Sequence, residues 1–309
     1  MNIDSQRKIE LARALSHLDR LGPADALPEV KDGRPIGEAF RIGITGPVGA
    51  GKSTLINRVA REFRRRDLTV GIIAVDPSSP FTGGAVLGDR VRMTDLTLDD
   101  GVFIRSIATR GSSGGLAAHA IDAADLLDSI GFDRIILETV GVGQTEVDIV
   151  QACDVTMVVL EPSSGDGVQA IKAGLMEIAD LFVVNKRDLR GADRFIADIE
   201  TTVEMKGGEH PPGVLATIAP TGEGVPELFR WLEDYYRRVV SDGTLEKRRT
   251  EQRVARIKRA AEEILRTELW RVVPEKDLKS VIKGDQAVRE AARAVVKAYL
   301  RAGSSKQGK

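Results

Sequence analysis

The chain of 309 residues has one cysteine, few aromatic residues and no long hydrophobic run. A single cysteine, Cys153, excludes an internal disulfide and any multi-cysteine metal site. It enters the apolar stretch "VTMVVL", which predicts a buried structural thiol. Aromatic residues make up only 4% of the chain and leave little for stacking on bases. No apolar run approaches the roughly 18 residues that a membrane span needs.

The chain also lacks an excess of charge of either sign. Its 45 basic and 46 acidic residues leave a net charge of −1, so binding to nucleic acid or to a membrane surface is not expected. The N-terminus has scattered charges and no apolar core, unlike a secretion signal, and a cytoplasmic location is expected. The three histidines, His17, His119 and His210, are isolated from one another, which argues against a nickel or zinc chaperone.

From residue 40 onward, short apolar segments alternate with helical ones. Strands that are apolar on both faces are typical of a parallel sheet covered by helices on both sides. The pattern predicts a doubly wound α/β domain whose ligand lies at the carboxyl ends of the strands. The predicted strands are "FRIGIT", "TVGIIAV", "GVFIRSI", "DRIILE", "DVTMVVL", "ADLFVVN" and "GVLATIA", and helices are predicted to begin near Lys52, Arg90, Leu116, Gln169 and Ala192.

Helical patterns flank this region on both sides. Residues 5–20 repeat apolar positions at helical spacing, and residues 245–271 and 285–302 are predicted to form two charged helices joined near Pro274. The predicted organisation is an N-terminal helical extension (1–39), a P-loop domain (40–240) and a C-terminal helical arm with a tail (241–309).

A glycine-rich motif, "GPVGAGKST", directly follows the first predicted strand and opens a helix. This is the P-loop pattern G-x-x-x-x-G-K-S in the context that it requires. The backbone N–H groups and the helix N-terminus would surround phosphates, Lys52 would reach the β and γ oxygens, and Ser53 would hold Mg2+. The predicted phosphate-binding residues are Gly46, Pro47, Val48, Gly49, Ala50, Gly51, Lys52, Ser53 and Thr54.

A second motif, "NKRD", follows a later strand and is typical of a guanine-reading turn. The carboxylate of Asp188 would accept from N1–H and the exocyclic amine of guanine, while the stem of Lys186 packs along the base. Asn185 completes the motif. A further loop with Ala219, Pro220 and Thr221 either closes over the base through backbone N–H groups or is a plain turn.

Three acids are candidates for a magnesium site. Asp76 and Glu138 end predicted strands, and Asp89 lies in a polar, glycine-rich segment that is too long for a simple connection. Mg2+ takes oxygen ligands and retains waters, so one or two acids with Ser53 and the phosphates would suffice. The alternative for each acid is a helix cap or a turn residue.

The segment "ETVGVGQ" after Glu138 raises the question of how water is positioned. Gly141 would place its N–H near the γ-phosphate and form a nucleotide-sensitive segment. The next residue is Val142, whereas small GTPases have a water-orienting glutamine there. Hydrolysis by the isolated chain is therefore expected to be slow.

Together, "GPVGAGKST", "VDPSSPFTGGAVLGDRVRM", "ETVGVGQTE", "EPSSGDGVQAIKAG" and "NKRD" resemble the MeaB/ArgK family of P-loop GTPases, in the SIMIBI class. The resemblance spans about residues 40–230. It implies a GTP-hydrolysing metallochaperone for an adenosylcobalamin-dependent acyl-CoA mutase, of which methylmalonyl-CoA mutase is the best-known example. The chaperone would gate delivery of intact cofactor and removal of damaged cofactor, and it would meet adenosylcobalamin only through that partner. Family members are typically homodimers that use a C-terminal helical arm.

The same resemblance suggests what completes the catalytic site. We hypothesise that the mutase orders loops containing Gln144 and the segment 163–167, which includes Asp166. Lys172 matches a lysine in a third switch that couples such GTPases to their partners, although it could also be a solvated helix residue. A P-loop kinase that transfers the γ-phosphate to a protein or a small molecule is the alternative function.

Overall fold

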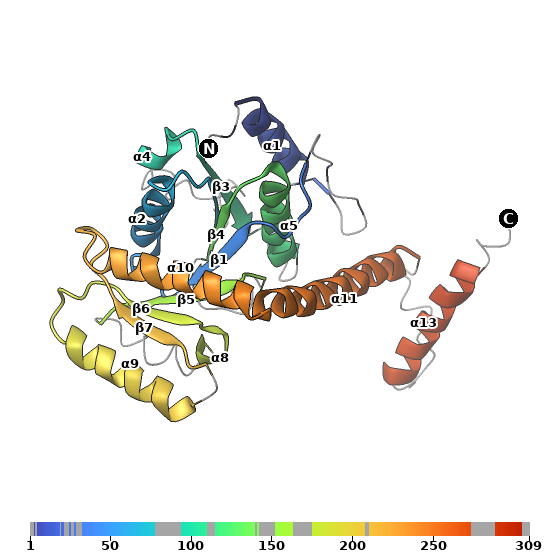
Figure 1. The fold of residues 1–309 in the computed structure, drawn as a ribbon. Helices are drawn as coiled ribbons and strands as arrows, with labels where there is room; N and C mark the ends of the chain where they lie inside the picture. Colours follow the sequence, from blue (N-terminus) through green and yellow to red (C-terminus); the bar gives the residue numbers. More distant parts are fainter. Residues whose placement is uncertain are drawn as a thin grey trace. The chain divides into compact units, whose positions relative to one another are not determined.

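Seven parallel strands form the centre of the protein in the computed structural model (Figure 1). Their order in the sheet is β3-β2-β4-β1-β5-β6-β7, and every neighbouring pair is parallel. The strands are β1 (Phe40–Thr45), β2 (Val70–Pro77), β3 (Val102–Thr109), β4 (Arg134–Glu138), β5 (Val155–Leu160), β6 (Leu181–Val184) and β7 (Gly213–Ala216).

The structure describes most of the chain, in several segments. The described residues are 3, 5–18, 20–21, 25, 28, 33–77, 94–109, 115–139, 141, 152–162, 175–207, 210–272 and 288–304. The predicted helix starts at Arg90 and Gln169 lie outside them.

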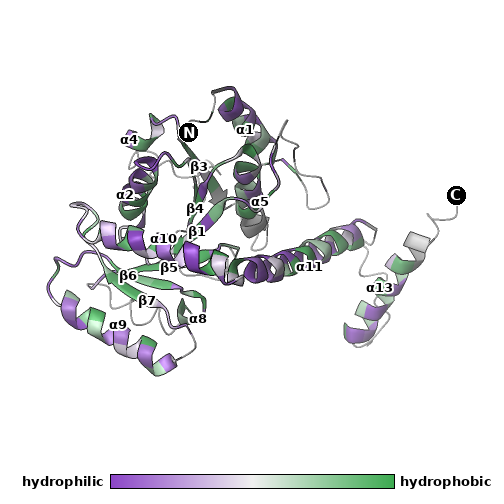
Figure 2. Cartoon of the chain, in the orientation of Figure 1, coloured by the Kyte–Doolittle hydropathy of each residue, from purple (hydrophilic) through white to green (hydrophobic). Residues whose placement is uncertain are grey.

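The strands are apolar because both faces of the sheet are covered. Alternate residues of β5 and β6 point to opposite faces: Met157 and Leu181 pack in one hydrophobic cluster, Val158 and Phe182 in another. Figure 2 shows the resulting hydrophobic colouring of β5, β6 and β7. The doubly wound α/β fold predicted from the sequence is confirmed.

Helices α2 (Lys52–Arg64) and α10 (Val225–Ser241) cover one face. Their contact includes the rings of Phe63 and Phe229, whose centroids are 5.1 Å apart. Helices α5 (Gly115–Ile130) and α9 (Ala192–Lys206) cover the other face, and α1 (Ser5–Leu18) contacts α5. The remaining helices are α4 (Thr94–Thr97), α8 (Met176–Ile178), α11 (Thr244–Val272) and α13 (Val288–Ser304).

The last predicted strand is too long. The segment "GVLATIA" was expected to be extended to residue 219, but β7 ends at Ala216. The N–H of Thr217 still donates to the carbonyl of Val184 (2.8 Å), after which Ile218 forms a bridge with Glu223. The chain therefore turns back at the carboxyl end of the sheet, where the tight turn outweighs the β propensity of the sequence.

The chain divides into two compact units. The first contains Met1–Arg20 and Leu27–Gln252, and the second contains Leu21–Ala26 and Arg253–Lys309. The first nine residues of α11 thus belong to the unit that contains the sheet. The domain boundaries predicted at 39/40 and 240/241 stay predictions. Within the described residues, no helix is both long and apolar enough to cross a membrane.

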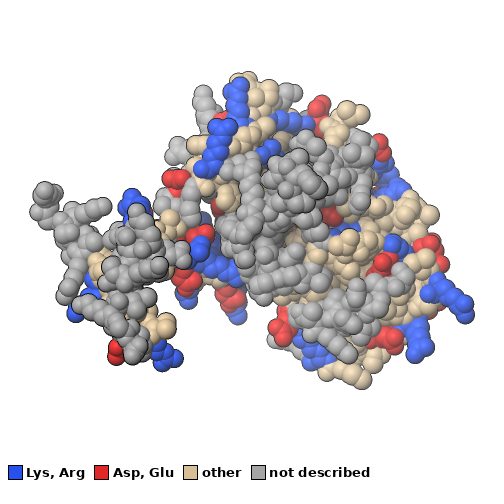
Figure 3. All heavy atoms as spheres, turned by 180° about the vertical axis from the view of Figure 1, so that it is seen from behind, with Lys and Arg blue, Asp and Glu red and all other residues tan. Residues whose placement is uncertain are grey.

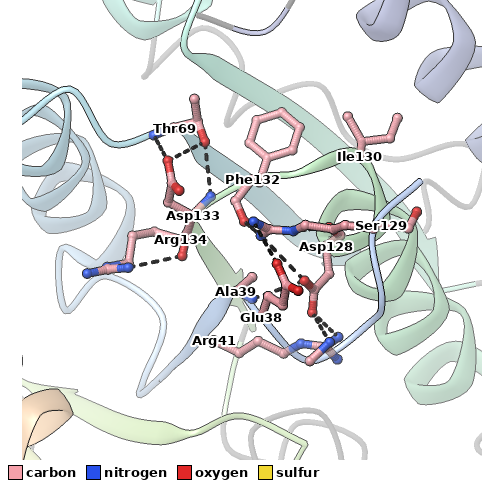
Figure 4. Close-up of polar contacts among 12 residues, drawn as sticks. Glu38, Ala39, Arg41, Thr69, Asp128, Ser129, Ile130, Phe132, Asp133 and Arg134 are labelled. Atoms are coloured by element: carbon pink, nitrogen blue, oxygen red, sulfur yellow. Dashed lines mark hydrogen bonds and ion pairs between the residues drawn. The ribbon is translucent and has the colours of Figure 1, made fainter. Parts of the chain in front are cut away.

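Oppositely charged side chains meet at the amino ends of the strands. Arg41 lies between Asp125 (2.7 Å) and Asp128 (3.0 Å), both on α5. Figure 4 shows the side chains of Arg41 and Asp128 pointing toward each other. Asp128 also accepts hydrogen bonds from the backbone N–H groups of Gly37 (2.8 Å) and Ala39 (3.0 Å). Burial alone would lower the pKa of Arg41, but the two carboxylates outweigh it and raise that pKa.

The start of α11 joins this group of charges. Arg249 pairs with Asp154 (2.6 Å), and Arg248 pairs with Asp180 (3.0 Å). The same oxygen of Asp154, Oδ2, also accepts from the backbone N–H of Arg41 (2.8 Å). We call Arg41, Asp125, Asp128, Asp154, Asp180, Arg248 and Arg249 the amino-edge network.

On the face drawn in Figure 3, the described charged residues are mixed in sign. In the view of Figure 3, basic and acidic side chains alternate over the described surface of the molecule. This mixture agrees with the net charge of −1.

Candidate functional site

The glycine loop connects β1 to α2 at the carboxyl edge of the sheet. Gly46 has φ +142°, and a Cβ there would lie 2.0 Å from the carbonyl oxygen of Val159. Gly51 has φ +89°, and its Cβ would lie 2.3 Å from Nδ2 of Asn185. Only glycine fits these positions, because the loop passes directly against β5 and against the residue that follows β6.

The side chain of Lys52 extends back along this loop from the first turn of α2. Its Nζ donates to the carbonyl oxygens of Gly46 (2.9 Å) and Pro47 (3.0 Å). The side chain is buried, with 7% of the residue exposed. An ammonium group held at a glycine loop and a helix N-terminus is the arrangement that binds phosphate oxygens.

Ser53 and Glu138 meet beside the loop. The hydroxyl of Ser53 donates to Oε1 of Glu138 (2.8 Å), and both residues are buried. The contact follows from the topology, since β1 and β4 are neighbours and Ile44 pairs with Glu138. A hydroxyl and a carboxylate next to a phosphate loop match the oxygen ligands that Mg2+ prefers, so these two residues fit a magnesium site.

The backbone after Glu138 is fixed against the end of β1. The hydroxyl of Thr45 donates to the carbonyl oxygen of Gly141 (2.7 Å), and the hydroxyl of Thr139 donates to Oγ1 of Thr45 (2.9 Å). Gly141 therefore lies beside the glycine loop. Thr45 and Thr139 are buried positioning residues that the motif-based reasoning did not identify.

Asn185 connects three loops. Its Nδ2 donates to the carbonyl of Ala50 in the glycine loop (2.8 Å). Its Oδ1 accepts from the N–H of Ala219 (3.0 Å) and from the hydroxyl of Thr217 (3.1 Å). With 1% of the residue exposed, these hydrogen bonds are shielded from water. One amide thus brings the glycine loop, the "NKRD" turn and the loop after β7 together.

The next residues of the turn face outward. Lys186 has φ +58° and forms an ion pair with Glu161, which directly follows β5. Asp188 is exposed. Glu161 was not singled out in the sequence, although it follows a buried strand as Glu138 ends one.

The loop after β7 has one buried and two exposed candidate residues. Ala219 is fully buried, whereas Pro220 and Thr221 are exposed. Arg58 on α2 donates to the carbonyl oxygens of Ala219 (3.0 Å) and Pro220. Arg58 was also missed in the sequence, because a lone arginine within a helix carries no motif.

Several predicted residues are placed only in part or not at all. Val48 is 75% exposed at the glycine loop. Asp76 lies in β2 opposite Ala108 of β3, and no side-chain position is described for it. No group of three or more potential metal ligands occurs among the described residues. Asp89, Gln144, Asp166 and Lys172 lie outside the described residues.

Comparison with known proteins gives a consistent set of relatives. The family model described as "Methylmalonyl Co-A mutase-associated GTPase MeaB" matches residues 23–273. A putative GTPase of Pyrococcus horikoshii is 53% identical over 221 residues, which are 69% of each chain. The GTPase ArgK of Escherichia coli is 36% identical over 233 residues, which are 74% of this chain and 70% of that protein.

Two further matches extend this set. The mouse protein "Methylmalonic aciduria type A homolog, mitochondrial" is 35% identical over 256 residues, which are 80% of this chain and 61% of that protein. A crystal structure described as an LAO/AO transport system kinase superposes with a TM-score of 0.68 at 25% identity, and covers 94% of this chain and 92% of the other. The fold is therefore shared over nearly the whole length.

Proposed function

Because the chain belongs to the MeaB family of methylmalonyl Co-A mutase-associated GTPases, we propose that it binds GTP at the carboxyl edge of the sheet and hydrolyses it to GDP and phosphate. The observation that carries the proposal is the convergence on Asn185. This one side chain ties the phosphate loop to the two loops that would hold guanine. These contacts support a phosphate site and a base site that form one unit.

The residues around this centre divide into three roles. Lys52 and the glycine loop bind the β and γ oxygens, with the N-terminus of α2 contributing its partial positive charge. Asp188 accepts from N1–H and the amine of guanine, and Lys186 lies along the base. Gly141, held by Thr45, offers its N–H to the γ-phosphate and so responds to whether that phosphate is present.

Magnesium would be held by Ser53 and Glu138 together with Asp76 and Asp89. When bound, the ion neutralises charge that develops on the phosphate oxygens during transfer to water. The Ser53–Glu138 hydrogen bond supports this assignment, since it already brings a hydroxyl and a carboxylate together beside the loop.

The partner in this proposal is an adenosylcobalamin-dependent acyl-CoA mutase. The family description names methylmalonyl Co-A mutase, which supports a mutase as partner. We place Gln144, Asp166 and Lys172 in loops that the mutase orders, so that GTP hydrolysis gates the loading of intact adenosylcobalamin and the removal of damaged cofactor. The chain acts as a homodimer, with residues 241–309 as its dimerisation arm.

Turnover of γ-labelled GTP, measured with and without the mutase, tests this function. We expect slow release of free phosphate by the chain alone, because Val142 cannot orient water. Addition of the mutase should accelerate release by orders of magnitude, since supplying missing charge stabilisation to such sites gives about 10³–10⁵ in rate. A fast rate that the mutase leaves unchanged would contradict the proposed partner.

The same experiment separates hydrolysis from phosphate transfer. The second candidate function is transfer of the γ-phosphate to an acceptor. It is favoured by the description of the related structure as an LAO/AO transport system kinase. Label in free phosphate supports a hydrolase, whereas label on a protein or a small molecule supports a kinase.

A further inference from the structure

We propose that Arg58 is a specificity-determining positioning residue for the nucleotide base. This inference rests on the proposed guanine site and identifies what shapes its outer loop. Arg58 lies on α2, six residues after Lys52, which is about 9 Å along the helix axis. The helix that begins at the phosphates therefore also reaches the loop after β7.

The contact is a fork on two successive carbonyl groups. Nε of Arg58 donates to the oxygen of Ala219 (3.0 Å), and Nη2 donates to the oxygen of Pro220. A planar guanidinium with several fixed donors suits such a pair of acceptors, and its charge strengthens both hydrogen bonds. The carbonyl groups are consequently held on the side of the loop that faces α2.

Ala219 is also held through its N–H group, on the side away from Arg58. The N–H of Ala219 donates to Oδ1 of Asn185 (3.0 Å), so both backbone polar groups of this buried residue have defined partners. Beyond it, the N–H groups of Thr221 (3.1 Å) and Gly222 (2.9 Å) return to the carbonyl of Ile218. The loop is thus a tight turn whose position relative to the glycine loop depends on Arg58 and Asn185.

The orientation of these carbonyls matters for the base. Guanine carries an acceptor oxygen at C6, and a peptide carbonyl facing it would repel it. By keeping the oxygens of Ala219 and Pro220 toward α2, Arg58 removes acceptors from the 6-oxo edge. Without Arg58, the loop should still close the site but should favour a 6-oxo purine less strongly.

The experiment compares two nucleotides that differ at this edge. Dissociation constants for GDP and for 2-aminopurine riboside diphosphate, which lacks both the 6-oxo oxygen and the N1–H, are measured by competition against a fluorescent GDP. Asp188 is the same in every variant, so the loss of N1–H affects each of them alike and the change in the ratio of the two constants reports on the 6-oxo edge. Arg58→Ala should weaken GDP binding by about tenfold, because the carbonyl oxygens of Ala219 and Pro220 lose their charged donor and are no longer held away from the 6-oxo group. It should weaken binding of the 2-aminopurine nucleotide by less than about threefold. The preference for GDP, measured as the ratio of the two dissociation constants, should therefore become smaller.

Two further variants make the result specific. Arg58→Lys keeps a charged donor without the fork and should restore part of the preference for GDP. Arg65→Ala removes an arginine directly after α2 that is 70% exposed and paired with Glu62 of that helix, and should leave both dissociation constants unchanged. Thermal unfolding of each variant identifies any loss of folded protein.

Two results would overturn the inference alone. In one, Arg58→Ala binds GDP as the unaltered protein does; in the other, it weakens both nucleotides by the same factor, as a purely structural residue would. If the unaltered protein itself fails to prefer GDP over ADP, the proposed nucleotide site fails, and the role of Arg58 fails with it.

Discussion

The two edges of the sheet use charge in different ways. At the amino edge, Arg41 is neutralised by two carboxylates within the same chain, and Asp154 and Asp180 are paired with arginines of α11. At the carboxyl edge, the hydrogen bonds described for Lys52 go to neutral carbonyl oxygens. These two contacts orient the ammonium group of Lys52 along the glycine loop, at the helix N-terminus where an anionic ligand would bind.

This difference separates stability from function. Removing one member of a buried ion pair leaves the other charge in a poorly solvated place, so changes at the amino edge should mainly destabilise the fold. Changes at the carboxyl edge should mainly reduce binding and turnover. A substitution at the amino edge that abolished nucleotide binding without destabilising the fold would contradict this separation. So would a substitution at the carboxyl edge that only destabilised the fold.

Lys52→Ala should have the largest effect. Loss of the ammonium group removes charge stabilisation of the β and γ oxygens, and kcat/KM for GTP should fall by about 10³. Lys247→Ala, at an exposed position of α11, is the control and should behave as the unaltered protein does. A Lys52→Ala protein that retained turnover would place the phosphates elsewhere.

Glu138→Gln should have the next largest effect on activity. The amide keeps the shape of the side chain but lacks the negative charge that attracts Mg2+, so kcat should fall by about 10² and the magnesium requirement should rise. Turnover measured across a magnesium titration checks this. Glu227→Gln, at a half-exposed side chain on α10, should leave the titration unchanged.

Arg249→Ala tests the amino edge. Breaking a buried pair costs roughly 3–5 kcal/mol, but the side chain of Arg249 is 26% exposed, so solvent screening reduces the loss. The free energy of unfolding, measured in urea, should fall by about 2–3 kcal/mol, while the dissociation constant for GDP stays within about twofold.

The exposed pair Arg237–Asp234 provides the matched control for this change. Both side chains are at least 70% exposed, so Arg237→Ala should alter stability by less than about 0.5 kcal/mol. A large loss of GDP affinity in Arg249→Ala would show that the two edges are not separate in function.

The last prediction concerns Cys153, which is next to Asp154 at the amino edge. The thiol is fully buried, and burial raises its pKa, so little reactive thiolate forms. A thiol reagent should modify the native protein about a hundredfold more slowly than the unfolded protein. Arg249→Ala should react faster than the unaltered protein, because loss of the ion pair opens the amino edge around Cys153. If the variant reacts as slowly as the unaltered protein, Arg249 affects global stability but not local opening of this edge.

The sequence predicts the fold because its local signals agree with one another. Apolar strands such as "RIILE" are buried on both faces, and Gly46 and Gly51 have positive φ where the P-loop motif requires glycine. The thiol of Cys153 is buried, as its apolar surroundings indicated. These features depend on short stretches, so a single sequence is enough to find them.

Other features depend on residues that are far apart in the chain. Arg58 and Ala219 are 161 positions apart, and Arg249 and Asp154 are 95 apart. No local pattern marks either contact, because each arises only once the sheet brings distant loops together. The end of β7 was also mispredicted, since Thr217 after the strand donates hydrogen bonds to the carbonyl of Val184 and to Oδ1 of Asn185 as the chain turns.

The central claim is that a guanine nucleotide binds at the carboxyl edge with its base read by Asp188. Calorimetry with GDP, ADP and xanthosine diphosphate tests it directly in the unaltered protein and in Asp188→Asn. The account predicts a strong preference for GDP that Asp188→Asn transfers to the xanthine nucleotide, because the amide can donate to the 2-oxo group of xanthine. Equal binding of GDP and ADP by the unaltered protein, or an Asp188→Asn protein that still prefers GDP, would contradict the account.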